Sequence, residues 1–338
     1  MNDSDSKYNA FALCREMLQT PDVIRSFDPA ITARAAESVA EAGRLFMTGE
    51  GSSRIFPAKN AIRRSLQWGT QLHPATDGSR QSATYDLGDF AVFAASNSGR
   101  TKEVVGLLQE LAAGGHERLF GISARQDNLL AEHTAETFVL TCGWEEAVAA
   151  TKSVVEQALI YQSLVSHVAG QDMPSLSAAA DAVETALTMD IDAAIVDRAG
   201  EGGTIYFAGY NDGVAEELTL KTNEIARRKS DFLEGTYAVH GIEEVMDRSD
   251  TIVVIEPFMA ELGKFREVLV DGVGCEVICI ATEKTDLPTI VVPDVGDLSG
   301  CVYLAAGWNL LVELGLAAGI DLDKPQRARK VGNEVEGE

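Results

Sequence analysis

The stretch DFAVFAASNSGRT, residues 89–101, joins an apolar run to a cluster of small polar side chains. DFAVFAA has the length and the continuous apolar character of a strand that is buried on both faces, as strands are in parallel sheets. SNSGRT then places three hydroxyls and one amide at the end of that strand, and a helical pattern starts right after it. The stretch therefore predicts a strand–turn–helix unit of an α/β protein.

The same plan continues along the 338 residues and is used twice. Four short apolar strands are predicted in each half, and each half closes with one long apolar helix. The strands are expected at 44–48, 89–95, 118–123 and 137–141, then at 204–209, 251–257, 275–281 and 289–293, and the closing helices at 148–168 and 301–319. The repeated order of elements predicts an internal duplication with two parallel sheets.

The expected organisation is a helical segment over 1–40, a first domain over 41–170, a second domain over 171–320 and a tail over 321–338. The boundary between the two domains falls where a proline and small residues interrupt the pattern, in AGQDMPSLSAAADAV. An amphipathic helix over 178–199 is expected to open the second half.

Charge and composition exclude several classes of protein. The 52 acidic residues outnumber 28 basic ones, so the formal net charge is −24, which disfavours binding to nucleic acids and anionic membranes. The basic residues are mostly arginine, and an acidic surface of this kind predicts a protein of a high-salt cytoplasm. We find no run of 18 apolar residues and no signal-like N-terminus, so a cytoplasmic location is expected. Five scattered cysteines predict buried free thiols rather than disulfides or a metal site.

A second polar loop, GEGSS at 49–53, follows the first predicted strand. In parallel α/β sheets, ligands bind beyond the carboxyl ends of the strands, where helix N-termini attract anions. Two such loops predict a phosphate site, although serine and threonine there could also cap helices. The loops lack the nucleotide P-loop pattern and the third glycine of the dinucleotide fingerprint. The corresponding place in the second half reads PFMAELGK, without serine or threonine, which favours a ligand site in the first half.

Together with EEAVAATKS at 145–153, these loops resemble the phosphosugar-binding motifs of the sugar isomerase (SIS) domain family. Over about residues 15–334 the chain resembles the isomerase half of glucosamine-6-phosphate synthase and, more closely, free-standing aminosugar-phosphate deaminases/isomerases and fructosamine-phosphate deglycases. The resemblance implies two tandem SIS domains, each a parallel five-stranded sheet flanked by helices in a flavodoxin-like three-layer sandwich. It implies that the sugar phosphate is bound by Gly51, Ser52, Ser53, Ser96, Asn97, Ser98 and Thr101, with Glu145 and the backbone of Val148 beside the sugar.

Candidate catalytic residues lie in the second half. Lys221 and Glu224 are three residues apart, so they share a face of a predicted helix that is expected to break at Gly235, and His240 follows next to Gly241. Taken alone, they could be an ordinary salt bridge and a hydrogen-bonded histidine. The SIS resemblance implies instead that Glu224 transfers the proton, Lys221 assists it, and His240 opens the sugar ring from the neighbouring subunit, so that a homodimer shares its active site.

The tail, residues 319–336, resembles the closing segment of the family. The resemblance implies that Lys330 contacts the open-chain sugar near C2 and that the tail acts as a lid. HGIEEVM replaces the H-G-P of the synthase, so Glu243 and Glu244 are expected to reshape the pocket. The N-terminus, MNDSDSKY, lacks the catalytic cysteine of a glutaminase domain, so no ammonia from glutamine is expected within this chain.

The leading hypothesis is an enzyme that isomerises and deaminates a 2-amino-2-deoxyhexose 6-phosphate, such as glucosamine 6-phosphate, without a metal or an organic cofactor. One alternative is a deglycase that splits a fructosamine 6-phosphate into glucose 6-phosphate and an amine. The other is a non-catalytic phosphosugar sensor.

Overall fold

The computed structural model describes residues 1–330 and 333–335. Its contacts divide the chain into two compact units, each made from several segments. The first unit contains Asp22–Glu146, Ala150–Leu176 and the described part of 328–338. The second unit contains Met1–Pro21, Ala147–Ala149 and Ser177–Arg327.

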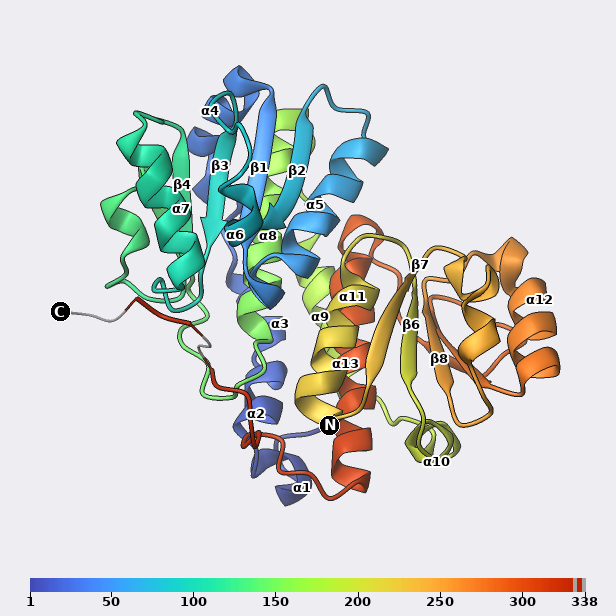
Figure 1. Ribbon diagram of the computed structural model, residues 1–338. Coiled ribbons are helices and arrows are strands. Elements are labelled where there is room, and N and C mark those ends of the chain that lie inside the picture. The colour runs from blue at the N-terminus through green and yellow to red at the C-terminus, as the bar shows by residue number, and fades with distance from the viewer. Residues whose placement is uncertain (331–332, 336–338) are drawn as a thin grey trace. The chain divides into compact units, whose positions relative to one another are not determined.

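Each unit is built on a parallel five-stranded sheet (Figure 1), which confirms the predicted fold class. The first sheet has the order β2-β1-β3-β4-β5, and the second has the order β10-β9-β8-β6-β7, which is the same order read from the opposite edge. The strands of the first sheet are β1 (Arg44–Gly49), β2 (His73–Gly78), β3 (Ala91–Ala95), β4 (Leu119–Ser123) and β5 (Glu136–Val139). Those of the second are β6 (Ile205–Gly209), β7 (Ser230–Glu234), β8 (Thr251–Ile255), β9 (Glu276–Ala281) and β10 (Thr289–Val291).

The sequence patterns do not identify one edge strand in each sheet. β2 reads HPATDG and β7 reads SDFLE, and neither contains an apolar run. An edge strand pairs on one side only and is partly exposed, so it needs fewer apolar residues. The prediction that the helix of Lys221 and Glu224 continues to Gly235 is wrong. The helix ends at Ala226, because the next residue, Arg227, adopts a left-handed conformation with a φ of 51°, and β7 follows.

Helices cover both faces of the first sheet, with α6 and α7 on one face and α4 and α8 on the other (Figure 1). α8 is buried along most of its length, and on the sheet the Phe93 ring stacks on Phe120 with centroids 4.6 Å apart. The helices of this unit are α4 (Ala33–Ala42), α5 (Ile55–Gln67), α6 (Ser79–Ser82), α7 (Lys102–Ala113) and α8 (Lys152–Ala169), with short 3₁₀ turns at Pro29–Thr32, Gly51–Ser53 and Leu130–Glu132.

The helices of the second unit are α1 (Ser6–Asn9), α2 (Ala12–Leu18), α9 (Leu176–Thr188), α10 (Ala193–Gly200), α11 (Val214–Lys221), α12 (Leu262–Phe265) and α13 (Ser299–Ala317). π-helical turns extend α11 over Thr222–Ala226 and α12 over Arg266–Val273, and α3 (Thr20–Ser26) crosses the division between the units. Short 3₁₀ turns lie at Tyr237–Val239, Ile242–Val245, Met259–Glu261 and Gly296–Leu298.

The single helix expected over 178–199 is two helices, α9 and α10. Asp192 starts the second one, because its carboxylate accepts the Ala194 N–H at 2.9 Å, as an N-cap residue does.

Among the described residues, one helix is long and apolar enough to cross a membrane, namely α13 with its preceding turn, Gly296–Ala317. It contains an 18-residue window with a mean hydropathy of 1.4, but 83% of that window is buried inside the fold. α13 packs against α10 and α11 of its own unit, so its apolar character is that of a core helix.

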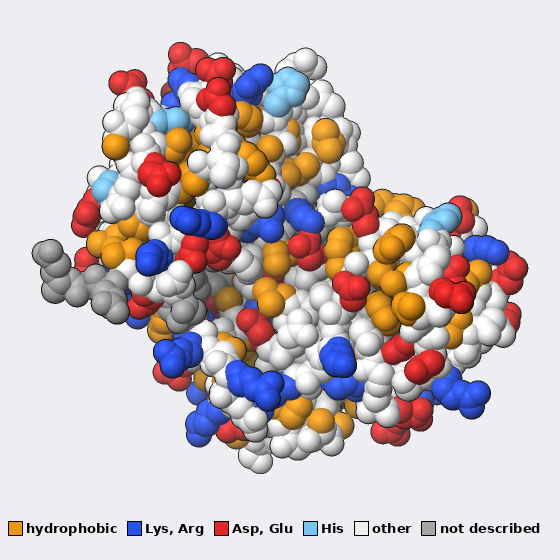
Figure 2. Space-filling view, in the orientation of Figure 1, with side chains coloured by type: hydrophobic (Ala, Val, Ile, Leu, Met, Phe, Trp, Pro, Cys, Tyr) orange, Lys and Arg blue, Asp and Glu red, His pale blue; other side chains and the backbone are white. Residues whose placement is uncertain are grey.

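Acidic side chains are spread over the face of the molecule drawn in Figure 2, and Lys and Arg side chains lie among them.

Candidate active site

The two polar loops of the first unit start from neighbouring strands. β1 ends at Gly49 and β3 ends at Ala95, and these two residues are partners in the sheet. A Cβ atom at Gly49 would lie 2.8 Å from the Ala95 carbonyl oxygen, so only glycine allows the two strand ends to approach this closely. Gly51 has a φ of 56°, and Ser52 and Ser53 follow it in a partly buried 3₁₀ turn. The parallel sheet thus brings GEGSS and SNSGRT to one edge.

Hydroxyl groups shape the SNSGRT loop from within. The Ser96 hydroxyl lies 2.8 Å from that of Thr101 and accepts the Thr101 N–H, while the Ser98 hydroxyl accepts the Arg100 N–H at 3.1 Å. Thr101 is the N-cap residue of α7, but its side chain makes no capping hydrogen bond. Helix capping therefore does not explain the hydroxyls of this loop.

Glu145 connects the loop to the third motif. Its carboxylate is fully buried and accepts the backbone N–H of Thr151 at 2.7 Å, the Thr151 hydroxyl at 2.8 Å and the Ser153 hydroxyl. The Asn97 amide in turn donates to the Ser153 hydroxyl at 3.0 Å. The chain Asn97–Ser153–Glu145 joins residues 96–101 to the start of α8. Glu145 thus positions the loops through Thr151 and Ser153.

Val148, from the same motif, is partly buried and belongs to the second unit. The preceding residue, Ala147, donates its N–H at 3.2 Å to the buried Glu16 carboxylate of that unit. The EEAVAATKS motif therefore contributes residues to both units.

The described part of the tail pairs with the phosphate-loop candidate. Glu334 forms an antiparallel bridge with Thr101, the Lys102 N–H donates to the Asn333 carbonyl at 3.1 Å, and the Val335 N–H donates to the Arg100 carbonyl at 2.9 Å. A tail segment is thus bound through its backbone to SNSGRT.

Lys330 lies further back along the tail, in the same unit. Its ammonium is 5.6 Å from the centre of the Trp144 ring, and the Arg125 guanidinium is 4.1 Å from the same centre. Trp144 directly precedes Glu145, so the structure brings Lys330 to the third motif.

The second unit contains a buried cluster of charges. Lys221 is fully buried, and its ammonium lies 2.8 Å from Glu224 and 3.2 Å from Glu217, which is also fully buried. Burial by itself would lower the pKa of Lys221, but the carboxylates of Glu224 and Glu217 raise it above its ordinary value. The lysine therefore stays charged, and the Glu224 side chain keeps 22% of its surface exposed.

His240 lies in the same unit, between the 3₁₀ turn Tyr237–Val239 and Gly241. Its side chain is exposed and makes no hydrogen bond or ion pair to this charge cluster within the described part of the chain. Gly241 has a φ of 111°, which glycine adopts readily, and its N–H donates to the Glu243 carboxylate at 2.6 Å. Glu243 therefore stabilises the turn that presents His240.

Cys142 lies near the third motif but is not a reactive thiol. Burial and the neighbouring Glu156 raise the pKa of its thiol. The Glu156 carboxylate also accepts the N–H groups of Thr141 and Cys142, at 2.7 and 2.8 Å. A thiol that stays protonated is a poor nucleophile, so this site does not support cysteine catalysis.

No protein-family model matches the chain. The chain is 26% identical over 328 residues to glutamine–fructose-6-phosphate aminotransferase (isomerizing) of Aeropyrum pernix, an alignment that covers 90% of this chain and 53% of that protein. The chain thus spans about half the length of this curated relative.

Two solved structures are similar over nearly the whole chain. The C-terminal domain of glucosamine-fructose-6-phosphate aminotransferase from Francisella tularensis has a TM-score of 0.77 and 17% identity, and it covers 96% of this chain and 100% of that one. Glucosamine-6-phosphate deaminase from Thermotoga maritima has a TM-score of 0.77 and 20% identity, with 96% and 99% covered. This chain has the fold of two tandem SIS domains.

The predicted site residues are distributed over both units. Gly51, Ser52, Ser53, Ser96, Asn97, Ser98, Thr101, Glu145 and Lys330 belong to the first, and Val148, Lys221, Glu224 and His240 to the second. Within the first unit, the hydroxyl loops, Glu145 and the tail come together. Within the second, Lys221 and Glu224 pair as their spacing predicts.

Sequence reasoning missed two residues of these groups. Glu217 lies four positions before Lys221, so its helical spacing was a signal that could have identified it. Trp144 has no such signal, because its partners Arg125 and Lys330 are distant in sequence.

Proposed function

We propose that this double SIS-domain protein is a phosphosugar isomerase that acts on a 2-amino-2-deoxyhexose 6-phosphate and releases ammonia. The buried cluster Glu217–Lys221–Glu224 supports this proposal most strongly. An ion cluster of this kind is often no more stabilising than apolar residues of similar size. Its presence in a SIS domain is better explained by proton chemistry than by stability, because perturbed ionisable groups gather at functional sites.

In the proposed reaction GEGSS and SNSGRT bind the phosphate. Their hydroxyls and the backbone N–H groups near the start of α7 are donors suited to a dianion. The tail segment that pairs with Thr101 would cover the bound phosphate, and Lys330 would approach the open-chain sugar near C2.

Proton transfer in this proposal follows the roles that the SIS resemblance implies for His240, Glu224 and Lys221. His240 opens the ring, and Glu224 removes the proton from C2 and delivers it to C1. The charged Lys221 stabilises the enolate-like intermediate between the two transfers. The resulting imine at C2 is hydrolysed by water, which releases ammonia and leaves a ketose 6-phosphate. The protons balance and no oxidant or reductant is needed.

We further infer that His240 acts on the site of a second copy of the chain. Its side chain is exposed and, among the described residues, makes no hydrogen bond or ion pair to the Glu224 cluster of its own unit, which supports this arrangement. Mixing a Glu224→Gln subunit with a His240→Ala subunit tests it. If the histidine acts in trans, random mixing restores about one quarter of the wild-type activity, because half of the dimers are mixed and each contains one complete site. If it acts within its own chain, mixing restores nothing.

The reaction itself is tested with glucosamine 6-phosphate, galactosamine 6-phosphate and fructoselysine 6-phosphate in high salt, with ammonia and hexose phosphate as readouts. We expect ammonia from one of the first two substrates and a loss of kcat of about 10²–10⁴-fold in Glu224→Gln. Glu201→Gln, an exposed carboxylate at the end of α10, is the control and should keep full activity.

Turnover of fructoselysine 6-phosphate alone would identify a deglycase instead. Binding of sugar phosphates without turnover of any substrate would identify a sensor.

A further inference from the structure

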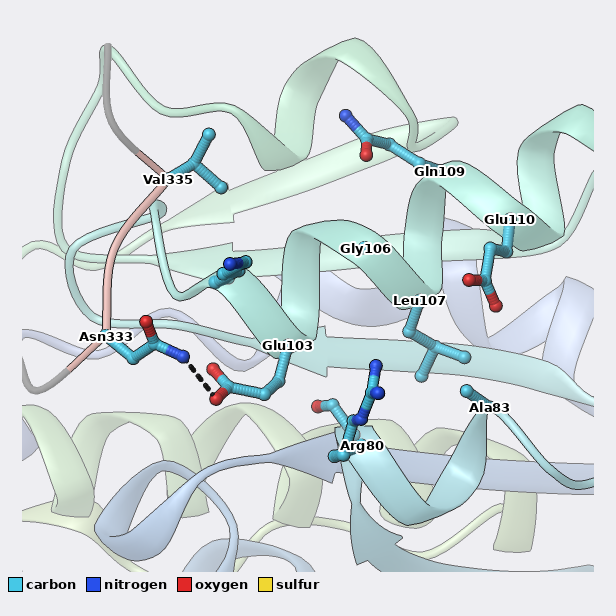
Figure 3. A pocket seen from close by; sticks show the side chains of 11 residues that line it. Arg80, Ala83, Glu103, Gly106, Leu107, Gln109, Glu110, Asn333 and Val335 are labelled. Atoms are coloured by element: carbon cyan, nitrogen blue, oxygen red, sulfur yellow. Dashed lines mark hydrogen bonds between the residues drawn. The ribbon is translucent and has the colours of Figure 1, made fainter.

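A cavity of the first unit lies between α6, α7 and the tail (Figure 3). It has a volume of about 510 Å³ and is lined by Ser79, Arg80 and Ala83 of α6, by Lys102, Glu103, Gly106, Leu107, Gln109 and Glu110 of α7, and by Asn333 and Val335 of the tail. We name it the α6–α7 pocket. Its volume is in the range of small-molecule sites. Neither the phosphate loops nor the charge cluster of the second unit accounts for it.

Gly106 is the first observation that supports ligand binding in this pocket. It lies in the middle of α7, where glycine is less favourable than alanine. A Cβ atom at Gly106 would meet nothing within 4 Å, and its φ lies outside the left-handed region. Neither close packing nor backbone conformation requires a glycine here. The residue instead keeps one wall of the pocket open.

The charged side chains of the pocket are the second sign. Arg80, Lys102, Glu103 and Glu110 line it, yet within the described ranges no ion pair joins any two of them. Glu103 accepts the Asn333 amide at 2.6 Å through one carboxylate oxygen, while its other oxygen is buried without a hydrogen-bond partner among the residues described. A buried carboxylate oxygen without a hydrogen bond lowers stability, so a hydrogen-bond donor from a ligand would be favourable at this atom.

The tail forms one wall. Asn333 contacts Glu103, as Figure 3 shows, and Val335 packs against the apolar cluster beneath α7. The same short segment pairs with Thr101 of the SNSGRT loop. A ligand in the pocket would therefore stabilise the docked tail, and by linkage the docked tail would favour the ligand.

We propose that the α6–α7 pocket binds a small zwitterion, with its ammonium group at Glu103 and its anionic group at Arg80, and that this ligand holds the tail on the SNSGRT loop. In Figure 3, Arg80 extends from α6 toward α7, where Glu103 lies near the tail. Free α-amino acids and aminosugar phosphates both carry this pair of charges. The site is distinct from the proposed catalytic groups and does not depend on the proposed reaction.

The test is titration calorimetry of the full chain with each L-amino acid and with glucosamine 6-phosphate. We expect one probe to bind the wild type, with affinity reduced at least tenfold in Arg80→Ala and in Gly106→Val. Arg34→Ala, an exposed arginine of α4 outside the pocket, is the matched control and should bind normally. Glucosamine 6-phosphate is measured again in Ser96→Ala/Thr101→Val, so that binding at the phosphate loop is separated from binding at the pocket.

Hydrogen exchange of the Lys102 and Val335 amides is the second readout, because both donate to carbonyls across the tail contact. Bound ligand should slow their exchange in the wild type but not in Arg80→Ala. This variant is expected to fold, because the Arg80 side chain is exposed. The proposal is overturned if no probe binds, if Arg80→Ala binds as tightly as the wild type, or if bound ligand leaves both amides unchanged.

Discussion

Replacing Lys221 by methionine would measure how much stability is lost when one partner of the buried charge cluster is removed. Lys221→Met keeps the length of the side chain but removes the cation that faces two carboxylates, of which Glu217 is fully buried. Breaking a buried ion pair by removing one partner costs about 3–5 kcal/mol. For a unit of this size, 1 kcal/mol corresponds to about 2–4 °C, so the melting temperature should fall by about 10 °C.

The pH dependence of this variant follows from the same contacts. In the wild type, the pKa of Lys221 is raised in the folded state. Its contribution to the free energy of unfolding is therefore fully present below the unfolded pKa of about 10.4, and it is lost only as the pH rises through the raised folded-state pKa. Between pH 5.5 and 8, Lys221 therefore does not make the stability of the wild type depend on pH. In Lys221→Met, the buried Glu217 loses the ammonium beside it, so burial is expected to raise its pKa above the unfolded value of about 4.3. The folded variant then binds the extra proton, and its loss of stability should shrink as the pH falls.

The assay is thermal unfolding of the full chain at pH 5.5 and pH 8. Lys264→Met is the matched control, since Lys264 pairs with Glu267 at the same i,i+3 spacing and 3.2 Å, but both side chains are at least half exposed. We expect that variant to stay within about 0.5 kcal/mol of the wild type. Glu217→Leu/Lys221→Met removes both buried charges and should recover most of the stability. The reasoning is refuted if Lys221→Met is no less stable than Lys264→Met, or if the double variant falls as far as the single one.

Three other changes test the first unit and the surface. Gly99→Ala should destabilise the chain by about 3 kcal/mol, since φ is 67° and a Cβ would lie 2.2 Å from the Asn128 Cβ; an unchanged melting temperature would contradict the tight turn. Glu145→Gln should cost about 2 kcal/mol and weaken sugar-phosphate binding, because a buried carboxylate loses charge-assisted hydrogen bonds, whereas the exposed Glu132→Gln should do neither in the same calorimetric titration. The chain should melt several degrees higher in 2 M than in 0.1 M KCl, since salt screens the repulsion of a net charge of −24; equal stability in dilute buffer would refute the high-salt hypothesis.

The sequence alone was sufficient for the parallel sheets and for the place of the phosphate-loop candidate. Buried parallel strands are continuous apolar runs, so β3 and β8 can be predicted from local sequence. Parallel topology then requires that the carboxyl ends of neighbouring strands share an edge, which brings Gly49 next to Ala95. The spacing of Lys221 and Glu224 likewise predicts their contact, because helical neighbours three apart share a face.

Only the tertiary structure decided which distant groups meet. The edge strands β2 and β7 have weak local patterns because one neighbour is enough to hold them. The contacts of Asn97 with Ser153 and of Thr101 with Glu334 join residues 56 or more positions apart, and no local periodicity encodes such pairs. Burial of Glu217 and the open space beside Gly106 also depend on what packs around them. Local sequence determines where the helices and strands form. Whether a charged side chain such as Glu217 destabilises the fold or takes part in chemistry, and whether the space beside Gly106 can hold a ligand, depends on the residues that folding places around them.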